Sequence, residues 1–207
     1  MLPRFYPILD VDTVLRRGLS VRDVAREIVS EDVRILQFRH KGFFSRQILA
    51  DLREIAAMCG ESGAMLVVND RADVARLIGA SLHLGQEDLR PSEARRIMGA
   101  DALIGYSTHN EEQLRSAAQE PADYLALGPI FGTASKRNHD PMVGVEELRR
   151  LRPLTDRPLA AIGGITRANA RIVIEAGADS VAVIGDLYPE RGGVGERVRE
   201  WLDLVER

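Results

Sequence analysis

The amino-acid sequence predicts a single α/β domain spanning residues 1–207, folded as a (β/α)8 barrel of the TIM type. Short apolar runs alternate with amphipathic stretches along the whole chain, and no linker, low-complexity tract or block of like charge interrupts the series. Eight of each kind in about 200 residues is the count of such a barrel, whereas a doubly wound open sheet usually has about five or six strands.

The apolar runs are rich in Val, Ile, Leu and Ala, and each is continuous over several residues rather than alternating with polar residues. This pattern is typical of strands that are buried on both faces, as in a parallel sheet. The predicted strands are 5–10, 33–39, 65–69, 81–85, 103–107, 124–130, 158–164 and 180–185.

The intervening stretches have apolar residues at helical spacing. In 20–32, for example, Val21, Val24, Ala25 and Ile28 share one face, and Ser20 is placed to cap the helix. The predicted helices are 20–32, 45–58, 71–79, 91–98, 110–118, 144–151, 166–177 and 196–206.

Composition excludes several classes of function. A net charge of −3 argues against a nucleic-acid partner held by general electrostatics. The lone cysteine, Cys59, excludes an internal disulfide and a multi-cysteine metal site, which fits a reducing compartment. The sequence shows neither a signal-peptide pattern nor an apolar run of about 18 residues that could span a bilayer. We therefore expect a cytoplasmic protein with no membrane partner, and the sequence is compatible with a homo-oligomer.

The carboxyl ends of the strands carry the catalytic groups in barrels of this type, so the residues after each strand matter most. Of the 28 basic residues only two are lysines, Lys41 and Lys136, and both follow predicted strands. In 37–41, "QFRHK", alternation places Gln37, Arg39 and Lys41 on one side of an extended segment while Phe38 faces the other way. Three such donors suit a phosphate group; the alternative is a solvated basic strand end.

Two acids follow neighbouring strands. Asp70 and Asp88 end strands that lie about 4.8 Å apart in a sheet, so their carboxylates can reach one ion. Mg²⁺ typically takes one or two carboxylates together with phosphate oxygens and water. Either acid alone could instead be a helix N-cap, Asp70 in particular.

Glycine backbone follows the last two predicted strands. "AIGGIT" (161–166) before a helix, together with Gly185 after the eighth strand, resembles the backbone cradle that barrels build for phosphate in this place. Ordinary turn chemistry is the alternative for the glycine pair. Among the histidines, we expect His83 to be a hydrogen-bonded core residue, His109 to precede and cap a helix, and His40 and His139 to be polar loop residues.

The motifs "QFRHK", "VVND", "HLGQED", "GYSTH", "GPIFGTASK" and "AIGGIT" occur in order and resemble those of the thiamine-phosphate synthases (thiamine-phosphate pyrophosphorylases) over about residues 5–188. That family joins 4-amino-5-hydroxymethyl-2-methylpyrimidine diphosphate to hydroxyethylthiazole phosphate and releases diphosphate and thiamine phosphate. The resemblance implies a transferase with small-molecule substrates and Mg²⁺, in which no covalent enzyme nucleophile takes part.

The resemblance also implies a role for each motif residue. Asp70 and Asp88 would hold Mg²⁺, and Lys136, Lys41 and Arg39 would be catalytic by stabilising the departing diphosphate. The pyrimidine diphosphate would be held by Gln37, Arg39, Lys41, Asn69, Ser107 and Lys136, with His40 in the same motif. The thiazole phosphate would be held by Thr133, Ser135, Gly164, Ile184 and Gly185.

The sequence departs from the family pattern in four places. The stretch "IGASLHLGQ" is one residue shorter than usual, Gly185 stands where serine is common, the segment "RNHD" after Lys136 is unusual, and His40 replaces an acid. Two alternatives stay open at this point: a thiazole tautomerase-like barrel that moves protons with a histidine base, and a non-catalytic, regulatory phosphate-binding barrel.

Overall fold

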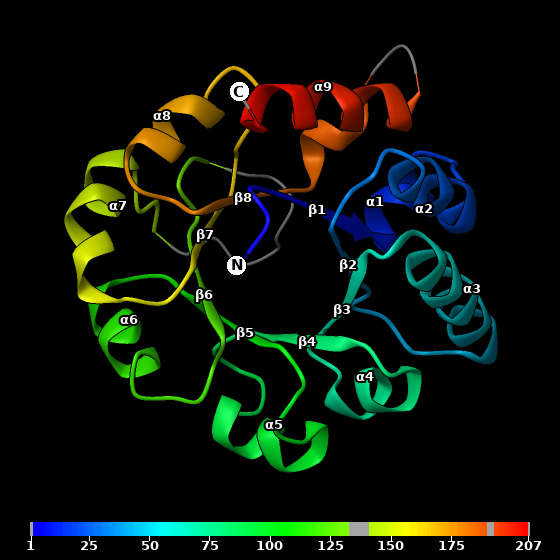
Figure 1. The fold of residues 1–207 in the computed structure, drawn as a ribbon, viewed down its shortest axis with the longest axis horizontal. Coiled ribbons are helices and arrows are strands. Elements are labelled where there is room, and N and C mark those ends of the chain that lie inside the picture. The colour runs from blue at the N-terminus through cyan, green and yellow to red at the C-terminus, as the bar shows by residue number, and fades with distance from the viewer. Residues whose placement is uncertain (1, 133–140, 190–192, 207) are drawn as a thin grey trace.

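The computed structural model describes residues 2–132, 141–189 and 193–206, and it confirms the predicted closed barrel (Figure 1). Every strand pairs in parallel with the next one along the chain, and β8 pairs with β1 to close the ring. The strands are β1 (Phe5–Asp10), β2 (Ile35–Arg39), β3 (Met65–Asn69), β4 (Ser81–Leu84), β5 (Ile104–Thr108), β6 (Tyr124–Leu127), β7 (Leu159–Ile162) and β8 (Ser180–Val183).

The helices form the outer ring around these strands (Figure 1). They are α1 (Val11–Arg16), α2 (Val21–Val29), α3 (Arg46–Ser62), α4 (Ala72–Ile78), α5 (Pro91–Met98), α6 (Glu111–Ala117), α7 (Val145–Leu151), α8 (Ala170–Glu175) and α9 (Val194–Glu206). Two single 3₁₀ turns, η1 (Arg152–Leu154) and η2 (Gly185–Leu187), complete the described elements.

Among the described elements, helix α1 is the one α-helix that the sequence pattern did not predict. It starts at the residue after β1, so no loop separates the strand from the helix. Its N-cap is Asp10, the last residue of the strand, whose carboxylate accepts a hydrogen bond from the Thr13 backbone N–H at 2.9 Å. A strand residue that is also a helix cap leaves no turn signal for a sequence pattern to detect.

Other boundaries differ for identifiable reasons. The predicted helix 166–177 begins only at α8, because the Asn169 side chain accepts from the Thr166 N–H at 2.7 Å and holds the preceding residues in a turn. The predicted strand 124–130 ends at Leu127, since Pro129 has no N–H to continue the ladder.

Apolar side chains pack in two layers. The larger layer lies between strands and helices and includes the stacked rings of Phe5 and Trp201, whose centroids are 5.4 Å apart. The smaller layer lies inside the barrel, where β6, β7 and β8 contribute the small residues Ala126, Ala160 and Ala182 beside Tyr124 and Ile162. Barrel interiors are usually filled by bulky branched side chains, so these three alanines leave room inside the barrel.

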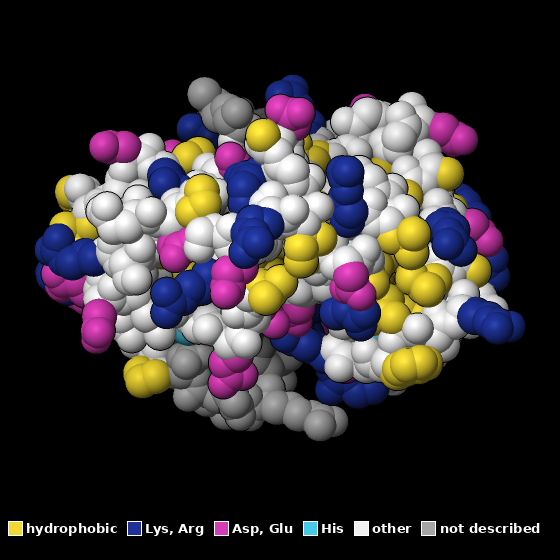
Figure 2. Space-filling view, turned by 90° about the horizontal axis from the view of Figure 1, so that it is seen from below, with side chains coloured by type: hydrophobic (Ala, Val, Ile, Leu, Met, Phe, Trp, Pro, Cys, Tyr) yellow, Lys and Arg dark blue, Asp and Glu magenta, His cyan; other side chains and the backbone are white. Residues whose placement is uncertain are grey.

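The outer surface carries interleaved charges of both signs, as Figure 2 shows on one face. Many of them are paired along or between helices, as in Arg150 with Glu147 and Glu111. In the described part of the chain, no helix combines the length and apolar character needed to cross a membrane.

We expect Trp201→Ala to lower the free energy of unfolding by about 3–5 kcal/mol, because it leaves a cavity where α9 packs on β1. Chemical denaturation monitored by circular dichroism measures this loss. Leu77→Ala is the control, since Leu77 is 62% exposed and its truncation should change the stability by no more than about 0.5 kcal/mol. Equal losses in the two variants would contradict the packing role of Trp201.

Candidate active site

A hollow of about 400 Å³, counted with its open mouth, lies inside the barrel toward the carboxyl ends of the strands. Its wall is polar on the side of β2 to β5 and apolar on the side of β6 to β8. The lining residues are Tyr6, Ile8, Gln37, Arg39, Asn69, His83, Ser107, Ala126, Ala160, Ile162, Ala182 and Ile184. The small alanines on one side therefore provide space for a ring, and the opposite side provides hydrogen-bonding groups.

Gln37 and Arg39 both line this cavity, which confirms that they share one side of β2. Phe38 lies between them in the sequence and is fully buried in the layer under the helices. Each polar side chain has an internal partner: Gln37 donates to the Tyr6 hydroxyl at 2.9 Å, and Arg39 forms an ion pair with Asp10. The pair with Asp10 fixes the guanidinium at the end of the strand.

Lys41 lies beyond the end of β2 and forms an ion pair with Asp70, which follows β3. Asp70 has a φ of 65°, in the left-handed region that non-glycine residues rarely adopt, although aspartate tolerates it better than most. The N-cap of α4 is Arg71, with no side-chain cap hydrogen bond. The alternative in which Asp70 caps this helix is therefore wrong, and its carboxylate is directed to the site.

Asp70 and Asp88 are brought together as their positions after adjacent strands predicted. The Asp88 carboxyl shares a hydrogen bond with Asp70 and accepts another from the Gly85 N–H at 2.7 Å. Burial, followed by this hydrogen bond and the charge of Asp70, raises the pKa of Asp88 to about 6. Bringing two carboxylates together raises the cost of ionising both, and either a proton or a cation relieves it.

The donor set of this pair suits Mg²⁺ rather than a metal held wholly by protein. Within the part of the chain that the structure describes, no group of three or more His, Cys, Asp or Glu side chains could hold a metal ion. Two carboxylates that leave the remaining positions to water and ligand oxygens match the usual coordination of Mg²⁺ in phosphate sites.

Asn69 and Ser107 both line the cavity at the ends of β3 and β5. The Asn69 amide nitrogen is buried and has no hydrogen-bond partner among the described residues. An unsatisfied buried donor in a cavity wall is costly unless a ligand pairs with it, which supports the prediction that Asn69 binds substrate. The Ser107 hydroxyl lies 2.9 Å from the Nε2 atom of His83.

The structure places His40 apart from these residues. Its ring packs edge-on against Phe44, its Nε2 atom lies 3.1 Å from the Phe43 carbonyl oxygen, and it is not among the cavity-lining residues. His109 does not cap α6, because Asn110 does so, and its Nδ1 atom lies 2.5 Å from the Gly128 carbonyl oxygen instead.

Sequence reasoning overlooked two polar residues of the cavity wall, Tyr6 and His83, and the acid Asp10 that pairs with Arg39. Asp10 ends β1, a position that the carboxyl-end rule covers, and the alternation of β1 places Tyr6 on the same side. His83 is buried and hydrogen-bonded as predicted, but it also faces the cavity and meets the Tyr124 hydroxyl. Inward alternation along β1, β4 and β6 is the signal that could have identified these residues.

The turn after β7 contains two successive glycines with positive φ. Gly163 and Gly164 have φ values of 98° and 63°, and a Cβ atom on Gly164 would lie 2.6 Å from the Gly132 carbonyl oxygen. Ile162 pairs with Ala182 across β7 and β8, so Gly164 and Ile184 follow at the same level of the rim. The N–H groups of Gly164 and Gly185 donate no hydrogen bond within the described residues.

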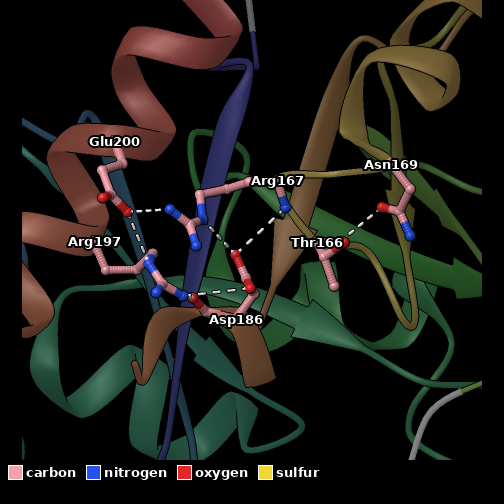
Figure 3. Close-up of polar contacts among 6 residues, drawn as sticks. All are labelled: Thr166, Arg167, Asn169, Asp186, Arg197 and Glu200. Carbon is pink, nitrogen blue, oxygen red and sulfur yellow. Dashed lines mark hydrogen bonds and ion pairs between the residues drawn. The ribbon is translucent and has the colours of Figure 1, made fainter. Parts of the chain in front are cut away.

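A cluster of four charged side chains ties this turn to η2 and α9 (Figure 3). Asp186, in η2, accepts from the Arg167 side chain at 3.3 Å, and its backbone carbonyl accepts from Arg197 at 2.8 Å. Glu200 binds both arginines and so closes the ring of contacts. The two glycine-bearing segments are thereby held in a fixed relation to each other.

Three predicted site residues, Thr133, Ser135 and Lys136, lie outside the described residues, as does His139. The structure describes the chain up to Gly132 on one side of them and from Pro141 on the other. Their predicted roles stay predictions.

Comparison with known proteins agrees with this geometry. The family model described as thiamine monophosphate synthase matches residues 5–187. A thiamine-phosphate synthase of Koribacter versatilis is 48% identical over 207 residues, which cover 99% of this chain and 96% of that protein. One from Methanoculleus marisnigri is 40% identical and covers 94% of this chain and 92% of that protein.

A solved structure, the thiamine phosphate pyrophosphorylase from Pyrococcus furiosus, superposes with a TM-score of 0.86 at 30% identity, covering 98% of this chain and 95% of that one. The match of the family model to nearly the whole chain, the identity to full-length relatives and the shared barrel all point the same way. The chain belongs to the thiamine monophosphate synthase family.

Proposed function

We propose that this chain joins 4-amino-5-hydroxymethyl-2-methylpyrimidine diphosphate to hydroxyethylthiazole phosphate, with release of diphosphate and thiamine phosphate. One observation supports this most strongly: a single cavity has a cationic and carboxylate rim over β2 to β4 and a glycine cradle over β7 and β8. Two phosphate-bearing substrates can therefore bind face to face in one barrel.

In this proposal, the diphosphate group of the pyrimidine substrate binds over Arg39, Lys41 and Asn69. Arg39 is held by Asp10, so its guanidinium is positioned before the substrate arrives. Lys41 is half exposed and can leave Asp70 for the diphosphate, while the Asn69 amide gains the partner it lacks. Lys136 is expected to add a second ammonium from the segment after β6.

Asp70 and Asp88 would hold Mg²⁺. When bound, this ion supplies charge that neutralises the diphosphate and so makes it a better leaving group. The carboxylate pair would hold the ion next to Arg39 and Lys41, where the diphosphate is proposed to bind. Burial, followed by the hydrogen bond to Asp70 and its charge, raises the pKa of Asp88, and the negative charge of the pair favours binding of a cation.

The reaction follows from these positions. The carbon–oxygen bond to the diphosphate breaks and its electron pair leaves with the diphosphate, whose growing charge Arg39, Lys41 and Lys136 stabilise. The electron-rich aminopyrimidine carries the resulting cation. The thiazole nitrogen attacks that carbon, held within reach by its phosphate in the cradle of Gly164 and Gly185. Apolar side chains from β6 to β8 keep competing water away from the cation.

The remaining proposals concern the setting of the enzyme. We place it in the cytoplasm with small-molecule substrates and without nucleic-acid or membrane partners, and a homo-oligomer is compatible with the fold. The overall charge of −3 and the interleaved surface charges support the absence of a nucleic-acid partner (Figure 2).

The direct test is incubation of the purified protein with both substrates and Mg²⁺. Thiamine phosphate and diphosphate should form in equal amounts, and leaving out either substrate should abolish both. Proton movement within the thiazole phosphate without condensation would instead support the tautomerase, and binding of both phosphates without turnover would support the regulatory barrel.

Asp88→Asn should raise the Mg²⁺ concentration needed for half-maximal activity, because one anionic ligand is lost while the fold is kept. In the unsubstituted protein, the Mg²⁺ concentration needed for half-maximal activity should also rise as the pH falls through about 6, because a proton on Asp88 competes with the cation. Activity measured over a series of Mg²⁺ concentrations and pH values checks both. Glu87→Gln is the control, because Glu87 is exposed; an equal effect there would contradict a specific role for Asp88.

Gly185→Ser should be tolerated and should tighten binding of the thiazole phosphate. No atom lies within 4 Å of the place where a Cβ would stand, and Gly185 is not among the glycines with positive φ. A hydroxyl there can add one hydrogen bond to a charged group, roughly 1.5–3 kcal/mol at best. The KM for thiazole phosphate measures the gain, and a higher KM or a large loss of stability would contradict it.

Lys136→Ala should lower kcat by about 10²–10³, the effect of losing one group that stabilises charge in the transition state. Lys136→Arg should restore activity only in part, because a planar guanidinium does not replace a compact ammonium. Arg137→Ala is the matched control for loss of one neighbouring positive charge. Full activity of Lys136→Arg would contradict the argument from the two lysines.

A further inference from the structure

Five polar side chains form a continuous hydrogen-bonded chain through the interior of the barrel. Gln37 lies 2.9 Å from the Tyr6 hydroxyl, which lies 2.8 Å from the Tyr124 hydroxyl. Tyr124 in turn lies 2.9 Å from Nδ1 of His83, whose Nε2 atom lies 2.9 Å from the Ser107 hydroxyl. All five residues are buried, and the two ends, Gln37 and Ser107, both line the cavity. We call these five residues the polar chain.

The backbone beneath the polar chain is shaped to let it form. A Cβ atom on Gly105 would lie 2.4 Å from the Tyr124 hydroxyl oxygen and 2.5 Å from Nδ1 of His83. Any side chain at this position of β5 would therefore separate the two groups. Glycine in the middle of a buried strand lowers strand stability, so its presence here fits a requirement for this contact.

The two tyrosines are neutral members of the polar chain. The pKa values of the Tyr6 and Tyr124 hydroxyls are both raised well above the usual value for tyrosine, and burial is the largest cause for each. Each hydroxyl therefore keeps one hydrogen and can donate one hydrogen bond. A neutral imidazole likewise has one N–H and one acceptor nitrogen.

Each of the four hydrogen bonds in the polar chain needs one hydrogen atom. With these donors and acceptors, two arrangements supply all four and use the hydroxyl hydrogens of both tyrosines. In the first, Gln37 donates to Tyr6, Tyr6 to Tyr124, Tyr124 to Nδ1 of His83, and Nε2–H of His83 to Ser107. In the second, every donation runs the other way. The first leaves the Ser107 hydrogen, the Gln37 carbonyl oxygen and one Gln37 N–H unused, and the second leaves a Ser107 acceptor and both Gln37 N–H groups.

The structure has the first arrangement at its Gln37 end, where the amide nitrogen donates to Tyr6. We infer that Tyr6 and Tyr124 are positioning residues that hold His83 as its Nε2–H tautomer, so that Ser107 donates a hydrogen bond to an acceptor of the pyrimidine diphosphate while Gln37 accepts one from its amino group. The identity of that ligand rests on the proposed function; the direction of the polar chain does not.

This arrangement makes the cavity selective by hydrogen-bond direction. An aminopyrimidine offers an amino donor, and its ring nitrogens and diphosphate oxygens are acceptors, which fit the two ends of the polar chain. An analogue with an oxo group in place of the amino group offers an acceptor to Gln37. Binding it would require reversal of all four links or leave buried groups unpaired, and either is unfavourable.

The tautomer of His83 tests the inference without any turnover. In protein labelled with ¹⁵N-histidine, two-dimensional NMR should show the His83 ring with Nε2 protonated and Nδ1 unprotonated. A His83→Gln variant identifies its signals among those of the four histidines. A His83 ring with the hydrogen on Nδ1 would overturn the inference. In Tyr124→Phe the preference for the Nε2–H form should diminish, because Nδ1 loses its donor.

Kinetics supply the second test. Tyr124→Phe should raise the KM for the pyrimidine diphosphate roughly fivefold to tenfold, the effect of one hydrogen bond, and leave the KM for thiazole phosphate unchanged. Tyr188→Phe is the matched control, since Tyr188 is a buried tyrosine outside the polar chain and neither KM should change. Equal changes in both KM values, or no change in either, would overturn the positioning role.

The two tests separate this inference from the proposed function. Synthesis of thiamine phosphate by a protein whose His83 is protonated on Nδ1 would refute the polar chain alone. The Nε2–H tautomer in a protein that makes no thiamine phosphate would refute the proposed function and leave the direction of the polar chain intact.

Discussion

The pairing of β8 with β1 closes the barrel, and the cavity at the centre of the candidate site depends on this closure. In a closed parallel sheet all carboxyl ends face one rim, so residues far apart in the sequence become neighbours there. Asp10 from β1 reaches Arg39 from β2, and Gly164 after β7 lies level with Ile184 after β8. In an open sheet with a different strand order, the charged residues after β2 to β4 and the glycine turn after β7 would not face each other across one cavity.

Among the residues that the structure describes, the charges on this rim do not balance, and the imbalance explains the chemistry that the site favours. Arg39 pairs with Asp10 and Lys41 with Asp70, which leaves the carboxyl of Asp88 beside Asp70. A partly buried acid with a like-charged neighbour has a raised pKa. The same excess of negative charge that favours a proton on Asp88 favours a divalent cation accompanied by phosphate oxygens.

The sequence was sufficient to predict the barrel and much of the rim because both depend on local patterns. Gln37 and Arg39 lie on one side of β2 because strand side chains alternate, and Asp70 and Asp88 meet because they follow adjacent strands. What could not be predicted depends on distant partners. The pairing of Tyr6 with Tyr124 joins residues 118 positions apart, and the left-handed backbone of Asp70 leaves no sequence signature.

The measurement that tests this account most directly is calorimetric titration of diphosphate into the protein with and without Mg²⁺. Two carboxylates alone are a sparse ligand set, so the account predicts that each ligand strengthens binding of the other by about tenfold or more. Near pH 5, binding of the pair should also release a proton from Asp88, whose pKa of about 6 is raised chiefly by burial. Equal affinity for diphosphate in the presence of a chelator, with no proton release, would contradict a shared site for the cation and the leaving group.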